Sequence, residues 1–145
     1  MAELLILAFL GHMIGDYLLQ PTWMAVGKSK KGMEGFGICM VHVTLYSIAV
    51  MVMLLASDRV YLSADADGRG VVLWLLILIP HFVIDYWSLG EKWSKLISGR
   101  TVEKTLATKP RVEREFAFAF YAPVYIAVDN TWHLLCLLAA IKYFF

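Results

Sequence analysis

Four long apolar blocks, separated by polar segments, dominate the hydrophobic pattern of the chain. They cover about residues 3–20, 35–56, 71–89 and 116–142. A helix needs roughly 20 mostly apolar residues to cross the hydrocarbon core of a bilayer. The pattern therefore predicts an all-α fold, an integral membrane bundle of four transmembrane helices that forms one domain over residues 1–145. The first block is short and polar enough for a hydropathy scan to miss it. It has no positive n-region and no small-residue cleavage site, so we expect it to be retained.

The composition favours a membrane protein over a soluble helical domain. Hydrophobic residues make up 60% of the chain and charged residues 17%, and the mean hydropathy is +0.66. Soluble domains have about 45–50% apolar and about 25% charged residues. The formal net charge of +1 and the lack of a basic stripe give no indication of a nucleic-acid partner. Cys39 and Cys136 lie in apolar blocks without CxxC spacing, which is typical of small core residues.

The basic residues are concentrated in two of the three loops between the blocks. Loop 57–70 holds two of them, against three aspartates. Because loops rich in Lys and Arg stay in the cytoplasm, we expect loops 21–34 and 90–115 to be cytoplasmic and both termini to lie outside. The three lysines of loop 21–34 are interpreted as topology signals that could also attract an anionic head group. The two basic loops contain ten of the 13 Lys and Arg residues: Lys28, Lys30, Lys31, Lys92, Lys95, Arg100, Lys104, Lys109, Arg111 and Arg114.

Two features near the fourth block leave alternatives open. Loop 90–115 mixes its charges with large apolar residues such as Trp93 and Leu96. It could form a helix that lies on the inner membrane surface, or a solvated charged linker, and the pattern favours neither. Pro123 either kinks the fourth helix or marks the point where an interfacial segment turns into the span.

All four histidines and three aspartates of the chain lie inside the apolar blocks. Three pairs are spaced i, i+4, so that each pair projects from one face of its helix. If the spans alternate in direction, the aspartates all lie nearer the cytoplasmic end and the histidines form a layer beyond them. The set is then expected to meet at one depth: His12, Asp16, His42, His81, Asp85, Asp129 and His133.

This set of side chains predicts a metal site. An ionisable residue inside a membrane costs about 2.5–3.5 kcal/mol on insertion scales and is usually functional. One His/Asp pair is readily explained as a structural hydrogen bond, but three pairs and a fourth histidine are poorly explained by packing. Imidazole and carboxylate ligands suit zinc, manganese or iron. Seven ligands exceed one tetrahedral centre, so we expect two divalent ions. A proton relay explains the residue types, but explains less well why they pair at one level.

Several neighbours of these residues have candidate supporting roles. Gln20, Tyr46 and Asn130 are spaced to orient the ligands from a second layer, although ordinary interhelical hydrogen bonds explain them equally well. Gly11 and Gly15 form a G-x-x-x-G motif, which allows close approach of two helices. Tyr17, like the tryptophans near the block ends, is assigned to the interfacial aromatic belt.

The motifs resemble a bacterial and phage membrane family known as domain of unknown function 3307. The segments that carry the resemblance are GHMIGDYLLQPTWMAVGKSK, HVTLYS, HFVIDY and VDNTWH. The pattern typical of the family is H-x-x-x-D-[FY]-x-[LF]-Q, then H-x-x-x-Y, H-x-x-x-D and D-Q-x-x-H. Asn130 departs from it, since members often have Gln there. The pattern is also similar to that of small membrane-bound metal-dependent hydrolases. The resemblance covers most of the chain and implies a location in the bacterial inner membrane.

These observations together predict a metal-dependent hydrolase of a phosphoester or a lipid-like substrate. Asp85 or Asp129 is the candidate general base for the attacking water, since no serine or cysteine nucleophile stands out. Membrane lipid and an amphiphilic substrate are the expected partners, and a homodimer stays open. Two alternatives remain at this point: a metal-ion or proton transporter that uses the same cluster, and a non-catalytic membrane protein that the cluster stabilises.

Overall fold

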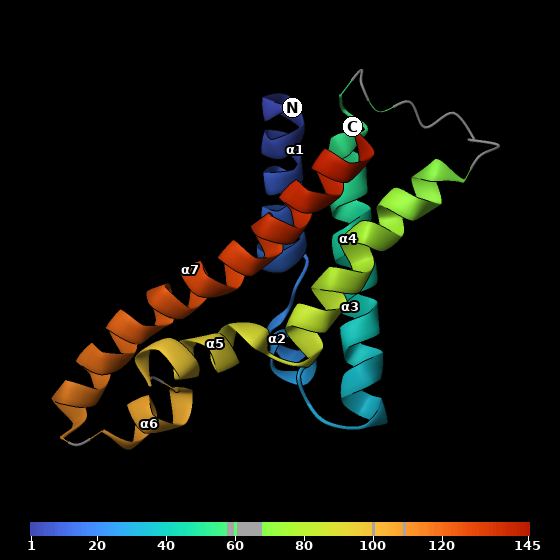
Figure 1. Cartoon of the computed structure of the whole chain (residues 1–145). Coiled ribbons are helices and arrows are strands. Elements are labelled where there is room, and N and C mark those ends of the chain that lie inside the picture. Colours follow the sequence, from blue (N-terminus) through green and yellow to red (C-terminus); the bar gives the residue numbers. More distant parts are fainter. Residues whose placement is uncertain (58–59, 61–67, 100, 109) are drawn as a thin grey trace.

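The protein is helical throughout the part of the chain that the computed structural model describes, which is residues 1–57, 60, 68–99, 101–108 and 110–145 (Figure 1). The all-α prediction is confirmed, and these residues include no strand. The elements are α1 (Ala2–Met13), the π-helix η1 (Ile14–Leu18), α2 (Thr22–Gly27), α3 (Met33–Leu54), α4 (Arg69–Tyr86), α5 (Leu89–Ser98), α6 (Val102–Ala107) and α7 (Arg111–Phe144).

Three of these helices, α3, α4 and α7, are long and apolar enough to cross a membrane. They correspond to the second, third and fourth apolar blocks. The first block forms α1 and η1, which have 12 and 5 residues. Together they span at most roughly 25 Å at 1.5 Å per residue, which is less than the hydrocarbon thickness of about 30 Å. A fourth span therefore stays a prediction.

The long helices form a bundle with two distinct ends. Both termini lie at one end, and α2, α5 and α6 lie at the other, which we call the loop end (Figure 1). α1 packs against α3, α3 against α4, and α4 against α7, while α1 also contacts α7. The segments 21–34 and 90–115 thus share one end, as the alternation of spans predicts. Most of loop 57–70, together with Arg100 and Lys109, lies outside the described residues.

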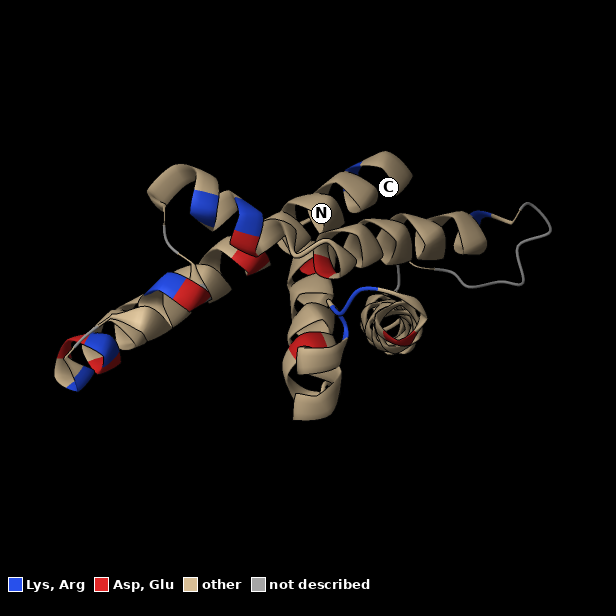
Figure 2. Cartoon of the chain, turned by 90° about the horizontal axis from the view of Figure 1, so that it is seen from below, with Lys and Arg blue, Asp and Glu red and all other residues tan. Residues whose placement is uncertain are grey.

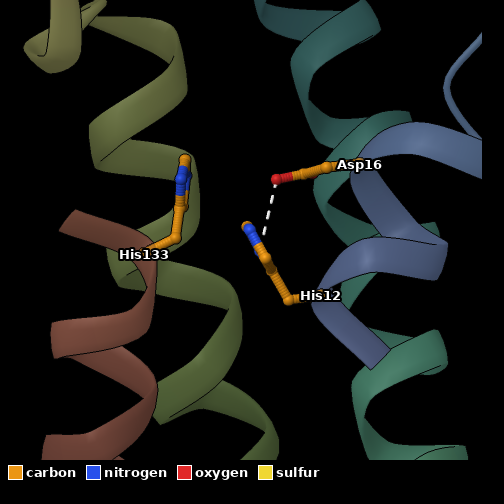
Figure 3. Close-up of side chains that lie close together, drawn as sticks. All are labelled: His12, Asp16 and His133. Carbon is orange, nitrogen blue, oxygen red and sulfur yellow. Dashed lines mark ion pairs between the residues drawn. The ribbon is translucent and has the colours of Figure 1, made fainter. Parts of the chain in front are cut away.

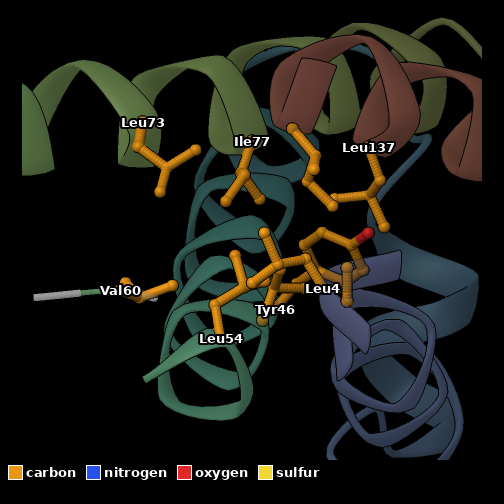
Figure 4. Packing of buried hydrophobic residues seen from close by; sticks show 10 residues of the cluster. Leu4, Tyr46, Leu54, Val60, Leu73, Ile77 and Leu137 are labelled. Carbon is orange, nitrogen blue, oxygen red and sulfur yellow. The ribbon is translucent and has the colours of Figure 1, made fainter. Parts of the chain in front are cut away.

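An apolar core fills the half of the bundle that is nearer the termini. Leu4, Leu54, Leu73, Ile77 and Leu137 pack there from four different helices, all at most 4% exposed (Figure 4). Many large apolar side chains on the outer faces of the long helices are exposed instead. This distribution is the one expected where lipid, rather than water, surrounds the helices.

Two glycines allow α1 and η1 to lie directly against α3. A Cβ added at Gly11 would lie 2.6 Å from Val50 Cα, and one at Gly15 would lie 2.7 Å from Cδ2 of Tyr46. Neither position has room for a side chain. The close helix approach predicted from the G-x-x-x-G motif is confirmed, and it brings His12 and Asp16 next to α3.

The described part of the segment after the third block is largely helical, while its position on the inner membrane surface stays a prediction. It forms α5, α6 and the first turns of α7, and these three pieces carry many of the charged residues seen in Figure 2. α7 runs through Pro123 as one helix of 34 residues, and α4 likewise continues through Pro80. α5 and α6 pack against α7 rather than extending away from it as a linker.

Replacing Gly11 tests whether the contact between α1 and α3 supports the bundle. We expect Gly11→Ala to lower the free energy of unfolding in detergent by about 2 kcal/mol, because the new methyl group meets backbone that must shift. Gly37→Ala is the matched control, since a Cβ there meets nothing within 4 Å. It should leave stability unchanged or raise it by up to about 1 kcal/mol. Equal stability of the two variants would contradict the packing described.

Candidate metal centre

Six of the seven predicted ligands meet inside the bundle, at the loop-end side of the apolar core. Their potential ligand atoms form three overlapping triads, and within each triad the atoms lie within 4.8 Å of one another. All four histidines are at most 2% exposed. Figure 3 shows His12 and Asp16 on the N-terminal helix facing His133 across the bundle. The triads are His12, Asp16 and His133; Asp16, His42 and His81; and His81, Asp85 and His133.

Asp16 turns its two carboxylate oxygens toward different histidines. Its Oδ2 lies 3.3 Å from His12 Nδ1, and its Oδ1 lies 3.3 Å from His42 Nε2 and 3.4 Å from His81 Nε2. Asp16 lies in the π-helix η1, where the backbone amide of Leu19 bonds to the carbonyl of Ile14, five residues earlier. Such wide turns are frequent at functional sites, and this one was not predicted from the sequence.

Asp85 likewise turns its two carboxylate oxygens toward different histidines. Its Oδ2 lies 3.0 Å from His42 Nε2 and 3.2 Å from His81 Nε2, while its Oδ1 lies 3.6 Å from His133 Nε2. The two Nε2 atoms of His42 and His81 are themselves only 3.1 Å apart. Two imidazole nitrogens this close need a proton or a cation between their lone pairs.

His133 presents a free lone pair to the cluster. Its Nδ1 lies 3.0 Å from the backbone carbonyl oxygen of Asp129. Because a carbonyl oxygen only accepts hydrogen bonds, Nδ1 carries the proton and Nε2 carries the lone pair. That Nε2 atom is buried and has no hydrogen-bond partner among the described residues. Metal-binding histidines are typically oriented in this way, through a bond from the nitrogen that does not bind the metal.

His12 is also oriented by a hydrogen bond to an oxygen atom of α7, but through Nε2 rather than Nδ1. Its Nε2 lies 3.1 Å from Asn130 Oδ1, which also accepts a 3.0 Å hydrogen bond from the hydroxyl of Tyr17. Because an amide oxygen only accepts hydrogen bonds, Nε2 of His12 is the donor. The lone pair on His12 Nδ1 therefore faces Asp16 and the hydroxyl of Tyr46, and the Tyr46 hydroxyl oxygen lies 3.3 Å from this nitrogen. The assignment of Tyr17 to the aromatic belt alone is therefore incomplete, because its hydroxyl supports the site.

The predicted supporting residues all touch histidines. Asn130 contacts His12, as described above. The ring of Tyr46 stacks on His81 with 3.5 Å between the ring centroids. Gln20 follows Asp16 at the i+4 position in the sequence, and its Nε2 lies 3.1 and 3.0 Å from the two ring nitrogens of His42. The π-turn and the bend at Leu19 end the helix before Gln20, so Gln20 lies against α3 rather than on the helix face of Asp16.

Lys28 belongs to the cluster, which the sequence did not indicate. It follows the short helix α2, and its Nζ lies 2.7 Å from Asp85 Oδ2 and 3.5 Å from His42 Nε2. Burial disfavours its ammonium form, but the carboxylates of Asp85 and Asp16 outweigh that effect and raise the pKa of Lys28 above its usual value. The interpretation of Lys28 as a topology signal is thus incomplete, since the side chain forms an ion pair inside the bundle.

Asp129 is the one predicted ligand that lies outside all three triads. Its Oδ2 is 3.7 Å from His133 Nδ1, and its side chain is 21% exposed. The carboxylate packs against Gly90 at the start of α5, where an added Cβ would lie 2.6 Å from Asp129 Oδ1. Asp129 therefore lies beside the cluster, between α7 and α5, rather than within it.

The residues present fit a divalent transition metal. The donor set mixes imidazole nitrogens with carboxylate oxygens, which suits zinc, manganese or iron. Two buried atoms that face the cluster, Asp16 Oδ1 and His133 Nε2, lack hydrogen-bond partners among the described residues. Buried polar atoms without partners are rare and call for an explanation, such as a bound ion.

Comparison with known proteins identifies the family of the chain. Residues 4–145 match the model of a family described as protein of unknown function, DUF3307, and the chain belongs to that family. No curated protein and no solved structure matches it. The resemblance drawn from the motifs is therefore confirmed for the family, while the similarity to metal-dependent hydrolases has no support from these comparisons.

Replacing Lys28 tests its place in the cluster. In the presence of EDTA, we expect Lys28→Met to lower the free energy of unfolding by about 3 kcal/mol, because it leaves Asp85 buried without its counter-charge. Lys30→Met is the control, since the Lys30 side chain is 51% exposed and pairs with Glu34 at the surface. Its effect should stay below about 1 kcal/mol. If both variants unfold like the wild type, Lys28 does not form the ion pair.

Proposed function

We propose that this member of the DUF3307 family binds divalent transition metal, zinc, manganese or iron, in its His/Asp cluster and hydrolyses a phosphoester in a lipid-like substrate. One observation carries the proposal. Four histidines and two carboxylates, contributed by all four apolar blocks, share one buried cluster. Such a concentration of ionisable groups among apolar helices is costly unless it has a function.

The six clustered side chains would hold the metal. Asp16 and Asp85 each direct one oxygen toward one histidine and the other oxygen toward the pair His42 and His81. Carboxylates in this position can be shared between two ions, and six donors exceed the four ligands of one tetrahedral ion. We therefore expect two ions per chain. A bound divalent metal would supply a nucleophilic water at neutral pH and polarise the phosphoester.

Of the two candidate general bases, Asp129 is favoured over Asp85. Both oxygens of Asp85 face histidines, and its Oδ2 also accepts from Lys28, so this carboxylate is already engaged. Asp129 lies beside His133, outside the triads and partly exposed. A carboxylate in that position can accept a proton from water while the ligand set stays intact.

Lys28 gives the cluster a group that suits an anionic substrate. Its ammonium contacts the same Asp85 oxygen that would bind a cation. A cation at that oxygen would therefore displace the ammonium, which could then bind the phosphoryl oxygens of the substrate as a point charge. Lys28 lies at the loop end, which we place on the cytoplasmic side because both basic loops lie there. The four-span topology in a bacterial inner membrane is part of the same proposal.

A transport function is less well supported by the space around the cluster. Beyond His81 and His133, toward the termini, the gap lined by Tyr46, Ile77 and Leu137 has no room for a water molecule. The apolar core follows directly. A carrier or proton relay needs a polar path to the far side of the membrane. The third candidate, a purely stabilising cluster, accounts for the ion pairs but not for the inward lone pair of His133.

Metal analysis tests the binding step. We expect protein purified without added metal, then reconstituted and freed of loose ions, to hold about two transition-metal ions per chain. Asp85→Asn and His81→Ala should lose at least one of them, because each removes a triad member. Asp129→Asn is the matched control and should keep both. Less than one ion per wild-type chain, even after reconstitution, would remove the basis of the proposal.

Hydrolysis can then be tested with two probes, bis(p-nitrophenyl) phosphate and phosphatidylglycerol vesicles. The metal-loaded protein should release product, lose activity in EDTA and regain it when metal is restored. Asp129→Asn should lower kcat by about 10²–10⁴-fold while its metal content is unchanged, as expected for loss of a general base. Metal flux into liposomes that is lost in His42→Ala, without hydrolysis of either probe, would instead support a transporter.

A further inference from the structure

A second candidate site lies at the loop end, next to the His/Asp cluster but separate from it. A cavity of about 580 Å³ opens between the turn that follows α2, the turn from α4 to α5, one face of α5 and the start of α6. Its size falls within the range of about 300–1,000 Å³ that is typical of small-molecule sites. Its walls include Ser29 and Tyr86, which directly follow Lys28 and Asp85 of the cluster.

The cavity is positively charged. Four lysines line it, against two glutamates. Lys30 is paired with Glu34, at 2.9 Å. The other three, Lys31, Lys92 and Lys95, form no ion pair with any described residue. Unpaired ammonium groups that surround a hollow favour an anion, and phosphate oxygens are strong acceptors for them.

The turn from α4 to α5, which lines the cavity, contains a residue with an unusual backbone conformation. Ser88 has a φ of +48°, and it is the only non-glycine residue with positive φ in the described part of the chain. It is also the N-cap of α5, yet its hydroxyl does not cap the first turn. Residues held in such strained backbone conformations cluster at binding sites. The hydroxyl and the positive end of the α5 dipole are both left for a ligand.

α5 also indicates that the anion belongs to an amphiphile. Gly90 and Ser94 are buried and lie on the face of α5 that packs on α7. A second face exposes Trp93, Leu96 and Ile97, at 42%, 73% and 68%. The third face carries Lys92 and Lys95, two of the cavity lysines. A short helix with a basic face and an exposed apolar face is typical of the membrane interface, where lipid head groups are at hand.

We propose that this cavity binds the phosphate group of an anionic lipid or lipid-like molecule, through Lys31, Lys92, Lys95 and Ser88. The binding does not require metal in the cluster, so it can be measured on the metal-free protein. Since Ser29 and Tyr86 of the cavity wall directly follow Lys28 and Asp85 in the chain, a head group bound there would lie next to the cluster. If the His/Asp cluster is the hydrolytic centre proposed above, this cavity defines its substrate class as an anionic phospholipid or a precursor of one.

Lipid binding by the full chain in detergent tests this proposal, with EDTA present so that the metal cluster has no part in the readout. Phosphatidylglycerol or phosphatidylcholine is titrated, and bound lipid is counted by native mass spectrometry. We expect clear preference for phosphatidylglycerol. Lys92→Gln combined with Lys95→Gln should weaken its binding by roughly tenfold or more, since each lysine near a membrane surface contributes to attraction of anionic lipid. Lys92→Arg combined with Lys95→Arg should retain binding.

The control removes two charges elsewhere at the same end. Arg111→Gln combined with Arg114→Gln changes the net charge equally but leaves the cavity intact, so lipid binding should be nearly unchanged. Lys92, Lys95 and Arg111 are exposed and Arg114 is half-buried, so we expect each variant to fold, which circular dichroism should confirm. Equal loss in both double variants, or none in the lysine variant, would overturn the proposal. Binding of inorganic phosphate without phosphatidylglycerol preference would overturn the lipid assignment.

Discussion

Ionisable side chains among apolar helices must find their partners within the protein, because lipid offers none. In this chain the constraint acts on all four apolar blocks at once. Asp16 contacts histidines of three different helices or helical segments, and Asp85 reaches His42 and His133 on two others. A shift of any helix by one turn would separate a carboxylate from its partners. The polar cluster therefore fixes the register of helices whose apolar surfaces alone would slide easily.

Small residues make this arrangement sterically accessible. Gly11 and Gly15 bring the first helix against α3, so that the side chains of His12 and Asp16 reach the centre of the bundle. Gly90 has the same role at the loop end, where α5 lies directly on the carboxylate of Asp129. Each close contact occurs within four residues of, or directly against, a member of the polar set. Backbone packing and polar pairing thus depend on each other, as is common in helix association within membranes.

The sequence predicts the parts of the site that depend on helical spacing. The i, i+4 pairs, His42 and the alternation of helix direction predict seven side chains at one depth, and six of them meet in the cluster. The glycine motif predicts the close helix pair. The remaining parts depend on local geometry and on the path of loops. The π-turn redirects Gln20 to His42, the return of the chain after α2 inserts Lys28, and the docking of α5 holds Asp129 aside. None of these has a periodic signal in the sequence.

The formal charges of the cluster connect the two proposed sites. Asp16 and Asp85 oppose Lys28, so the cluster has a formal charge of −1 when its histidines are neutral. Two divalent ions would reverse this to a strongly positive charge, which is costly in a region of low dielectric. An anionic ligand at the loop end would offset that excess, and so would movement of Lys28 away from Asp85. Metal binding and anion binding should therefore strengthen each other, and the basic cavity lies where such an anion would approach.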